Sequence, residues 1–122
     1  RIMLAIRCVL NDRDGVGCII YDEVDTGISG STSRKVGLKL RRISKETQVI
    51  CVTHSAQIAS LADTHFFVSK SEADGRVQTA VRILTPEEEQ DAIARILGGL
   101  SVTDAQRQAA ADMLAGKDRE EL

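Results

Sequence analysis

The feature that most constrains the fold is an apolar run, residues 16–21, that ends abruptly in the carboxylates Asp22 and Glu23. The run is apolar on both faces, which is typical of a central strand in a parallel sheet. A buried strand that leads into two acids is costly unless a cation lies there, because unpaired buried charge is strongly destabilising. A Mg²⁺ ion carried by a nucleotide phosphate is the usual solution. Asp22 and Glu23 are therefore the first candidates for chemistry.

A second apolar strand with a polar end follows the same pattern. Residues 49–52 are apolar and lead into Thr53 and His54, and residues 31–45 between the two runs carry apolar side chains at helical spacing. A strand, a helix and a strand in this order predict a βαβ unit. Ligands in such sheets bind beyond the carboxyl ends of the strands. The acid pair and His54 are therefore expected at one edge of the sheet.

Turn signals and hydrophobic periodicity predict a β-hairpin and further helices. The hairpin strands are 66–69 and 77–83, on either side of the Asp74–Gly75 turn. The helical segments are 1–11, 56–62, a stretch from Pro86 to Gly99, and an Ala-rich stretch ending near Ala115. The predicted fold class is α/β, with a mostly parallel sheet flanked by helices and with a hairpin and two helices at the C-terminal end.

The last two helices carry start signals in the sequence. Thr85 with Glu88, and Thr103 with Gln106, have the spacing of capping boxes, and a proline occupies the first position of the earlier helix. The side chains expected on the core face of that helix are Ile93, Ile96, Leu97 and Leu100.

Composition narrows the function classes. A chain of 122 residues fits one domain, and its net charge of −2 argues against a domain that mainly binds a phosphate backbone. Aromatic residues make up only 2%, so base-stacking platforms are not expected. No apolar run approaches the roughly 18 residues of a membrane span, and no signal peptide is visible. The cysteines Cys8, Cys18 and Cys51 lack CxxC spacing and are expected to be buried thiols.

The small residues after the acid pair complete a predicted nucleotide site. Gly27, Ser29 and Gly30 allow close backbone approach or N–H contacts to an anion. Asp22 is predicted to hold Mg²⁺ directly or through water, and Glu23 to polarise the water that attacks a γ-phosphate. His54 is expected to hydrogen-bond a phosphate oxygen. Each signal also has a structural explanation: surface ion pairs or capping for the acids, a simple turn for the glycines, and a structural hydrogen bond for His54.

The order of these pieces resembles the second half of an ABC-type ATPase head. Asp22-Glu23 is similar to the Walker B pair, Gly27–Gly30 to the D-loop region, and His54 to the switch histidine. The wording of residues 22–30 and 52–59 is similar to the C-terminal head segment of the RecN family of bacterial DNA-repair proteins, relatives of SMC proteins. Ordinary ABC transporters carry Pro-Thr directly after the acid pair, where this chain has Val-Asp.

The resemblance covers essentially the whole chain and implies both an activity and its missing parts. Residues 1–122 are expected to be the C-terminal half of an ABC-type head, without Walker A or the signature loop, because no GxxxxGK[ST] sequence occurs. The implied function is ATP binding and hydrolysis in recombinational repair of DNA double-strand breaks, with ATP and Mg²⁺ as cofactors. The implied location is the bacterial cytoplasm, at the nucleoid. Because the chain opens on Arg1, it is expected to be cut from a longer protein. Because it contains no phosphate loop, it is expected to be inactive alone.

The resemblance also implies partners. These are the N-terminal half of the same head, a second head in an ATP-dependent dimer, and DNA bound by the full-length protein. In this fold the strand leading to the phosphate loop lies between the 49–52 strand and the 66–69 strand. Without it both edges are unpaired, which predicts an edge-paired or swapped oligomer, or a distorted sheet.

The helix at 31–45 has a basic face that admits two explanations. Its cations are Arg34, Lys35, Lys39, Arg41, Arg42 and Lys45. A solvated helix face accounts for them, and contact with DNA is the sharper alternative.

Two other functions fit parts of the sequence. A phosphoacceptor receiver domain would use Asp22, Thr53 and Lys70, although such domains need an acid pair on an earlier strand. A non-catalytic assembly module would use the exposed strand edges or the Ala-rich helix.

Overall fold

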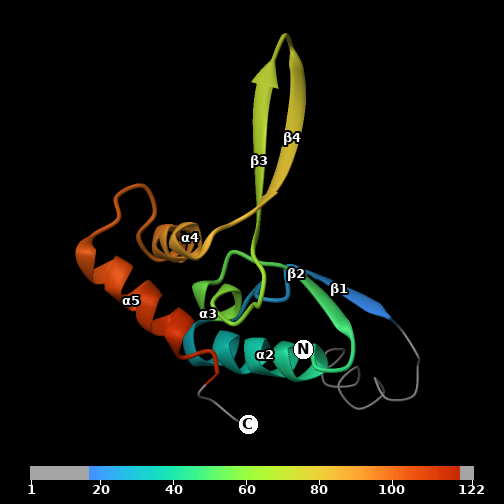
Figure 1. Cartoon of the computed structure of the whole chain (residues 1–122), viewed down its shortest axis with the longest axis vertical. Coiled ribbons are helices and arrows are strands. Elements are labelled where there is room, and N and C mark those ends of the chain that lie inside the picture. The colour runs from blue at the N-terminus through green and yellow to red at the C-terminus, as the bar shows by residue number, and fades with distance from the viewer. Residues whose placement is uncertain (1–16, 119–122) are drawn as a thin grey trace.

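The computed structural model describes residues 17–118, which form two small sheets and four helices (Figure 1). In chain order the elements are β1 (Cys18–Asp22), α2 (Gly30–Ile43), β2 (Gln48–Val52), α3 (Ala56–Ala59), β3 (Phe66–Ala73), β4 (Arg76–Ile83), α4 (Pro86–Gly98) and α5 (Asp104–Ala115). The predicted helix at 1–11 and the cysteine at position 8 lie outside the described residues. None of the described helices is long and apolar enough to cross a membrane.

The strands β1 and β2 pair in parallel and are joined through α2, which confirms the predicted βαβ unit. The register runs from Cys18 opposite Gln48 to Asp22 opposite Val52. One face of this pair packs on the helices: Tyr21, Val49 and Cys51 contact the buried cluster of Val36, Leu40 and Ile58. The apolar side chains at helical spacing in α2 include Val36, Leu40 and Ile43, and all three are buried.

The prediction that both strands are buried on two faces was wrong for this part of the chain. Ile20, Ile50 and Val52 are 67%, 45% and 54% exposed, and Cys18 on the same face is exposed too. Side chains alternate between the faces of a strand. The helices cover one face, and no element within residues 17–118 covers the other. The apolar sequence of β1 and β2 is thus suited to a sheet whose second face is covered by a further element.

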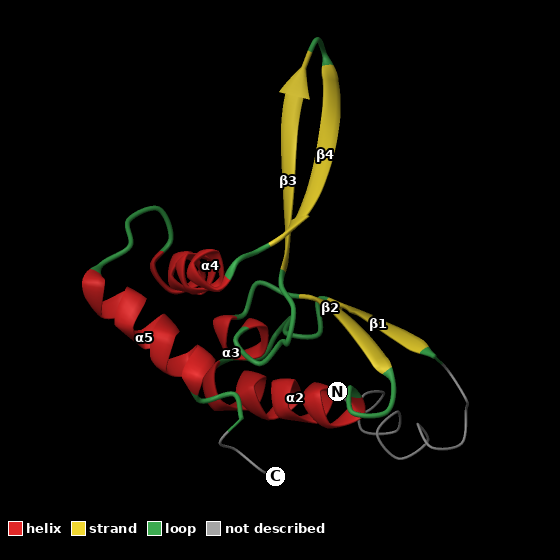
Figure 2. Ribbon diagram, in the orientation of Figure 1, coloured by secondary structure: helices red, strands yellow, loops and turns green. Residues whose placement is uncertain are grey.

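The hairpin β3–β4 forms a separate antiparallel sheet that projects away from the helices (Figure 2). Its turn residues Asp74 and Gly75 have φ values of 52° and 70°, which suit a two-residue turn of the kind that matches strand twist. Every residue in both strands is exposed. A lone two-stranded hairpin is marginally stable in water, so its apolar side chains are expected to need a partner surface.

The helices α4 and α5 both begin at the predicted capping boxes. Thr85 N donates to Glu88 Oε2 at 2.9 Å, and Thr103 N donates to Gln106 Oε1 at 2.9 Å. In each box the reciprocal bond from the backbone of the later residue is 3.3 Å long. The hydrogen bond from the Thr85 backbone also lowers the pKa of Glu88. Both helix starts were therefore correctly predicted.

The core face predicted for α4 was only partly correct. Ile93 is 1% exposed and packs with Ala56, Ala94 and Ala110 in a buried cluster. The other predicted core residues, Ile96, Leu97 and Leu100, are 39%, 40% and 110% exposed. Leu100 lies beyond the helix end, where the backbone turns away at Gly99 with a φ of 66°. The contact with α5 therefore uses a narrower stripe than the sequence suggested.

Close packing between α2 and α3 depends on Gly37. A Cβ atom at this position would lie 2.6 Å from Leu61 Cδ1, 3.3 Å from Ile58 Cα and 3.4 Å from the Gln57 carbonyl oxygen. We expect Gly37→Val to destabilise the chain by about 1–3 kcal/mol through overpacking. Chemical denaturation followed by circular dichroism measures the change. Thr32→Val, at an exposed position of α2, is the matched control. An unchanged denaturation midpoint for Gly37→Val would show that α2 and α3 can move apart to accommodate the larger side chain.

Candidate functional site at the carboxyl ends of β1 and β2

The predicted acid pair lies at the carboxyl end of the parallel strands. Asp22 is the last residue of β1 and pairs with Val52, the last residue of β2. The backbone N–H of Glu23 donates to the Val52 carbonyl oxygen at 3.0 Å, and Glu23 itself has a φ of 50°. His54 follows β2 by two residues. The structure thus places both polar clusters at one edge of the sheet, as the sequence predicted.

The loop from β1 to α2 is built from tight turns. Thr26 N donates to the Glu23 carbonyl oxygen and Ile28 N to that of Asp25, each at 3.2 Å. Gly27 has a φ of 72°, a conformation that costs other L-residues about 1 kcal/mol or more. A Cβ atom at Gly27 would contact nothing within 4 Å, so backbone conformation accounts for this glycine.

The remaining predicted anion contacts lie at the start of α2. Ser29 is the residue before the helix, and its side chain makes no capping hydrogen bond. Gly30 opens the helix with a φ of 52°, and a Cβ atom there would also meet open space. Ser29 and Gly30 are both exposed. Their contact with a nucleotide stays a prediction.

Asp25 is the residue of this edge that sequence reasoning missed. Its side chain is 3% exposed, and its Oδ2 lies 3.6 Å from Nδ1 of His54, whose own side chain is 81% exposed. The other oxygen, Oδ1, is buried without a hydrogen-bond partner among the described residues. A second acid three positions after a strand-ending Asp was the available signal. Loop acids are normally solvated, which is why the signal was weak.

Negative charge is concentrated where β2 ends. Burial raises the pKa of the Cys51 thiol to about 11, and the carboxylates of Asp25 and then Asp22 add to this rise. The thiol is therefore protonated at neutral pH and is a poor metal ligand, since metals bind the thiolate. Cys51 is partly buried, whereas the prediction of a buried thiol was wrong for Cys18, which lies on the uncovered face.

The donor set at this edge suits a hard cation only in part. Carboxylate oxygens such as those of Asp22 and Glu23 are the ligands that Mg²⁺ prefers. Within residues 17–118, however, no group of three or more His, Cys, Asp or Glu side chains is arranged to hold a metal ion. An ion carried by a phosphate needs only one or two protein carboxylates. The residues present therefore fit a nucleotide-borne ion better than a resident one.

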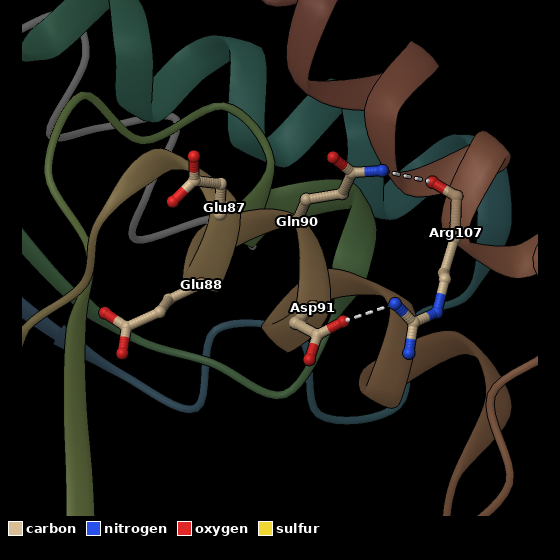
Figure 3. Close-up of a pocket in the computed structure, with 5 residues that line it drawn as sticks. All are labelled: Glu87, Glu88, Gln90, Asp91 and Arg107. Carbon is tan, nitrogen blue, oxygen red and sulfur yellow. Dashed lines mark hydrogen bonds and ion pairs between the residues drawn. The ribbon is translucent and has the colours of Figure 1, made fainter.

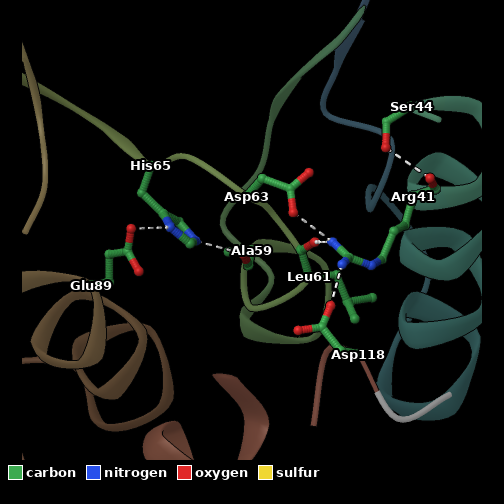
Figure 4. A network of polar contacts seen from close by, with 8 residues as sticks. All are labelled: Arg41, Ser44, Ala59, Leu61, Asp63, His65, Glu89 and Asp118. Carbon is green, nitrogen blue, oxygen red and sulfur yellow. Dashed lines mark hydrogen bonds and ion pairs between the residues drawn. The ribbon is translucent and has the colours of Figure 1, made fainter. Parts of the chain in front are cut away.

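Two other polar clusters serve the fold (Figure 4). His65 Nε2 lies 2.7 Å from the Ala59 carbonyl oxygen, and its Nδ1 lies 3.0 Å from Glu89 Oε1, at ion-pair distance. The side chains of His65 and Glu89 are 11% and 18% exposed. These contacts join the segment before β3 to the last residue of α3 and to α4, so His65 has a structural role.

Arg41 belongs to a second structural cluster. Its guanidinium donates to the Leu61 carbonyl oxygen at 3.0 Å, to Asp63 Oδ1 at 2.9 Å, and to Asp118 (Figure 4). The side chain is only 23% exposed. Arg41 thereby ties α2 to the loop after α3 and to the segment after α5, so it is not a free cation for DNA.

A surface hollow between α4 and α5 does not suit a phosphate ligand (Figure 3). Its lining residues are Glu87, Glu88, Gln90, Asp91 and Arg107. Arg107 is already paired with Asp91 at 3.4 Å, and Gln90 Nε2 donates to the Arg107 carbonyl oxygen at 3.1 Å. The remaining charges are acidic, which would repel phosphate.

The receiver-domain alternative finds no support in this arrangement. It requires Lys70 beside Asp22 and Thr53, but Lys70 lies in the β3–β4 sheet, which is separate from the β1–β2 sheet. Thr53 is also engaged locally, because its Oγ1 accepts a hydrogen bond from Ser55 N at 3.0 Å.

The curated proteins that are similar to this chain share one description. No protein-family model matches the chain. The chain is 43% identical over 114 residues to DNA repair protein RecN of Halalkalibacterium halodurans and 39% identical over 119 residues to RecN of Bacillus subtilis. It is 42% identical over 114 residues to RecN of Xylella fastidiosa. These matches cover 93%, 98% and 93% of this chain, but only 20%, 21% and 20% of the relatives.

One solved structure is similar in fold. It belongs to work on the structural biochemistry of ATP-driven dimerization and DNA-stimulated activation of SMC ATPases. It superposes with a TM-score of 0.60 over 78% of this chain and 56% of that chain, at 21% sequence identity. The likeness shows the fold alone: the described elements share the mixed α/β arrangement of that chain. The chain spans about a fifth of the length of the curated relatives it matches.

Proposed function

We propose that this chain, a RecN-family sequence that corresponds over nearly its whole length to the C-terminal segment of that DNA repair protein, supplies the hydrolytic edge of an ATP-driven head. The observation that carries the proposal is the shared edge of β1 and β2. There the Glu23 N–H bonds to the Val52 carbonyl oxygen at 3.0 Å, so the acid pair and His54 lie on neighbouring strand ends.

Each side chain at this edge has a separate task in the proposal. Asp22, exposed at the end of β1, holds the nucleotide-borne Mg²⁺ directly or through water. Glu23, one position on, is the general base that takes a proton from the attacking water. His54 hydrogen-bonds a γ-phosphate oxygen. When bound, ATP would supply the phosphoryl group, and Mg²⁺ would neutralise the charge that develops on it. The replacement Glu23→Gln in the full-length protein tests the assignment.

The loop glycines have a supporting task. With φ values of 72° and 52°, Gly27 and Gly30 hold the backbone of the loop in conformations that other residues rarely adopt. The backbone N–H groups around exposed Ser29 are then available to an anion. In the proposal these contacts reach a nucleotide whose phosphates are held chiefly by the N-terminal half of the head, because no phosphate-loop sequence occurs in this chain.

The proposed partners supply the parts of a nucleotide site that the edge of β1 and β2 does not provide. A phosphate cradle from the N-terminal half of the same head completes the nucleotide site, and a second head closes it in an ATP-dependent dimer. The uncovered face of β1 and β2 and the projecting hairpin are the surfaces on which the N-terminal half would pack. The exposed fractions of Ile20, 67%, and Phe66, 62%, support a covered state in the complete protein. The chain alone is then inactive in ATP turnover.

A basic face on α2 is the proposed contact with DNA. Lys35, Lys39 and Arg42 are exposed and spaced four and three residues apart, so they lie on one face of the helix. We expect Lys39→Glu with Arg42→Glu in the full-length protein to weaken DNA binding and to lower its salt slope by about 2, one for each lost phosphate contact. Fluorescence anisotropy at several salt concentrations measures both quantities.

The control for the DNA experiment reverses two cations elsewhere. Lys70→Glu with Arg76→Glu changes the net charge equally but acts on the exposed hairpin. Equal weakening by both pairs would indicate a general charge effect, and an unchanged affinity for the α2 pair would remove this face from DNA contact.

A further inference from the structure

The side chain of Asp25 has an environment that is costly for a carboxylate. It is 3% exposed in the loop after β1, and its Oδ1 has no hydrogen-bond partner among the residues that the structure describes. Burying a carboxylate without full pairing usually costs several kcal/mol, and uncompensated cases in native proteins are uncommon. A buried acid of this kind at the edge of a candidate active site calls for a functional explanation.

The imidazole of His54 lies over this carboxylate. Its Nδ1 is 3.6 Å from Asp25 Oδ2, an ion-pair distance that is longer than a hydrogen bond. The ring is 81% exposed, so a small rotation of the side chain closes the gap. With Nδ1 facing the buried acid, Nε2 on the other side of the ring faces away from the loop. Nδ1 of His54 therefore faces Asp25, whereas Nε2 is accessible to a ligand.

The other groups close to Asp25 do not neutralise it. The Cys51 thiol is protonated, since burial together with Asp25 and Asp22 raises its pKa to about 11. Asp22 carries the same charge as Asp25. The backbone hydrogen bond within the loop uses the Asp25 carbonyl oxygen, which accepts from Ile28 N, and does not involve the carboxylate. Among the residues that the structure describes, the imidazole of His54 lies at ion-pair distance from this carboxylate and can donate a proton to it.

We propose that Asp25 is a positioning residue for His54. Its carboxylate keeps a proton on Nδ1, which fixes the orientation of the ring and turns Nε2 towards the nucleotide. The ring so held donates from Nε2 to a phosphate oxygen in its doubly protonated form, in which both nitrogens are donors. A neutral imidazole has one donor and one acceptor nitrogen, and a hydrogen bond at one nitrogen sets the role of the other. Buried carboxylates orient catalytic and metal-binding histidines in this way. The task at Nε2 rests on the proposed function of His54, whereas the contact at Nδ1 does not.

The chain offers a direct spectroscopic test because it contains two histidines. Long-range ¹H–¹⁵N correlation spectra of the labelled chain report the tautomer of each ring. At a pH of about 8.5, above the ordinary histidine pKa of about 6.5, His54 should show a proton on Nδ1. His65, fixed between Ala59 and Glu89, is the internal reference. A proton on Nε2 of His54 in the unmodified chain would overturn the proposal without any variant.

Substitution of the acid provides the second test. Asp25→Asn should shift His54 towards the tautomer with a proton on Nε2, while Asp74→Asn, at the exposed hairpin turn, should leave it unchanged. Because Asn has the shape of Asp without its buried charge, the unfolding midpoint of Asp25→Asn should not fall. A lower midpoint with an unaltered tautomer would assign Asp25 a structural role instead.

Turnover by the full-length protein separates this inference from the proposed function. Asp25→Asn should lower kcat roughly 10- to 100-fold with little change in KM, as for other residues that orient a catalytic histidine. In a His54→Ala background the same change should have no further effect, because the two residues act as a unit. Full additivity would contradict the coupling. If His54→Ala leaves turnover intact while the tautomer depends on Asp25, the pairing stands and the catalytic role of His54 fails.

Discussion

Replacing Glu23 by Gln in the full-length RecN-type protein should lower ATP turnover by about 10²- to 10⁴-fold while ATP binding persists. Glu23 lies at the exposed edge directly after Asp22, with a positive φ of 50°. Gln keeps the size of the side chain but cannot accept a proton from the attacking water. General-base catalysis contributes about 10²- to 10⁴-fold, so kcat should fall by that factor. Phosphate release measures turnover, and equilibrium titration with a fluorescent ATP analogue measures binding.

The matched control for this experiment is Glu87→Gln. Glu87 is an exposed glutamate in the first turn of α4, in the acidic hollow and far along the chain from the proposed edge. It should leave both turnover and binding unchanged. Turnover retained by Glu23→Gln would remove Glu23 from the role of base, whereas loss of ATP binding would indicate that the acid acts mainly on the metal ion.

The isolated chain should self-associate, and two substitutions on one face of the hairpin should return it to a monomer. Val68 and Val81 pair across β3 and β4 and are 57% and 60% exposed, on the same face as Phe66 and Ile83. An exposed apolar patch on a hairpin with unpaired strand edges favours association with another copy of the chain. Replacing both valines by Lys places two charges on that face. Light scattering should then report the mass of a monomer.

The control moves the same two charges to the opposite face. Ser69 and Ala80 also pair across the hairpin and are exposed, but their neighbours on that face are mainly polar. Ser69→Lys with Ala80→Lys should leave the association of the chain unchanged. A monomeric unmodified chain, with protected amides across residues 49–52, would contradict the expectation of exposed pairing edges.

The local signals of the sequence were sufficient for the order and type of the elements. Alternating or helical apolar spacing, the Asp74–Gly75 turn and the capping boxes at Thr85 and Thr103 all act within a few residues. The parallel pairing of β1 with β2 also followed, because a strand, a helix and a strand have few alternative topologies. Prediction was least accurate where burial depends on distant segments, as at Ile20 and Leu100.

The candidate site divides in the same way. The position of Asp22, Glu23 and His54 at one edge could be derived from strand ends alone. The burial of Asp25 could not, because a loop acid becomes buried only when the loop folds back against the end of β2. The reassignment of Arg41 from a possible DNA contact to an ion-pair cluster has the same cause, since its partners Asp63 and Asp118 lie 22 and 77 residues away in sequence.

By itself the sequence determined the βαβ unit, the acid-ended strand and the resemblance to a RecN-type head, because these depend on short-range periodicity and on residue order. Tertiary structure alone decided which charges are free and which are engaged. Burial and ion pairing are set by segments that are distant in the chain and close in space. The acid that ends β1 is exposed and available, whereas the acid three positions later is buried beside His54.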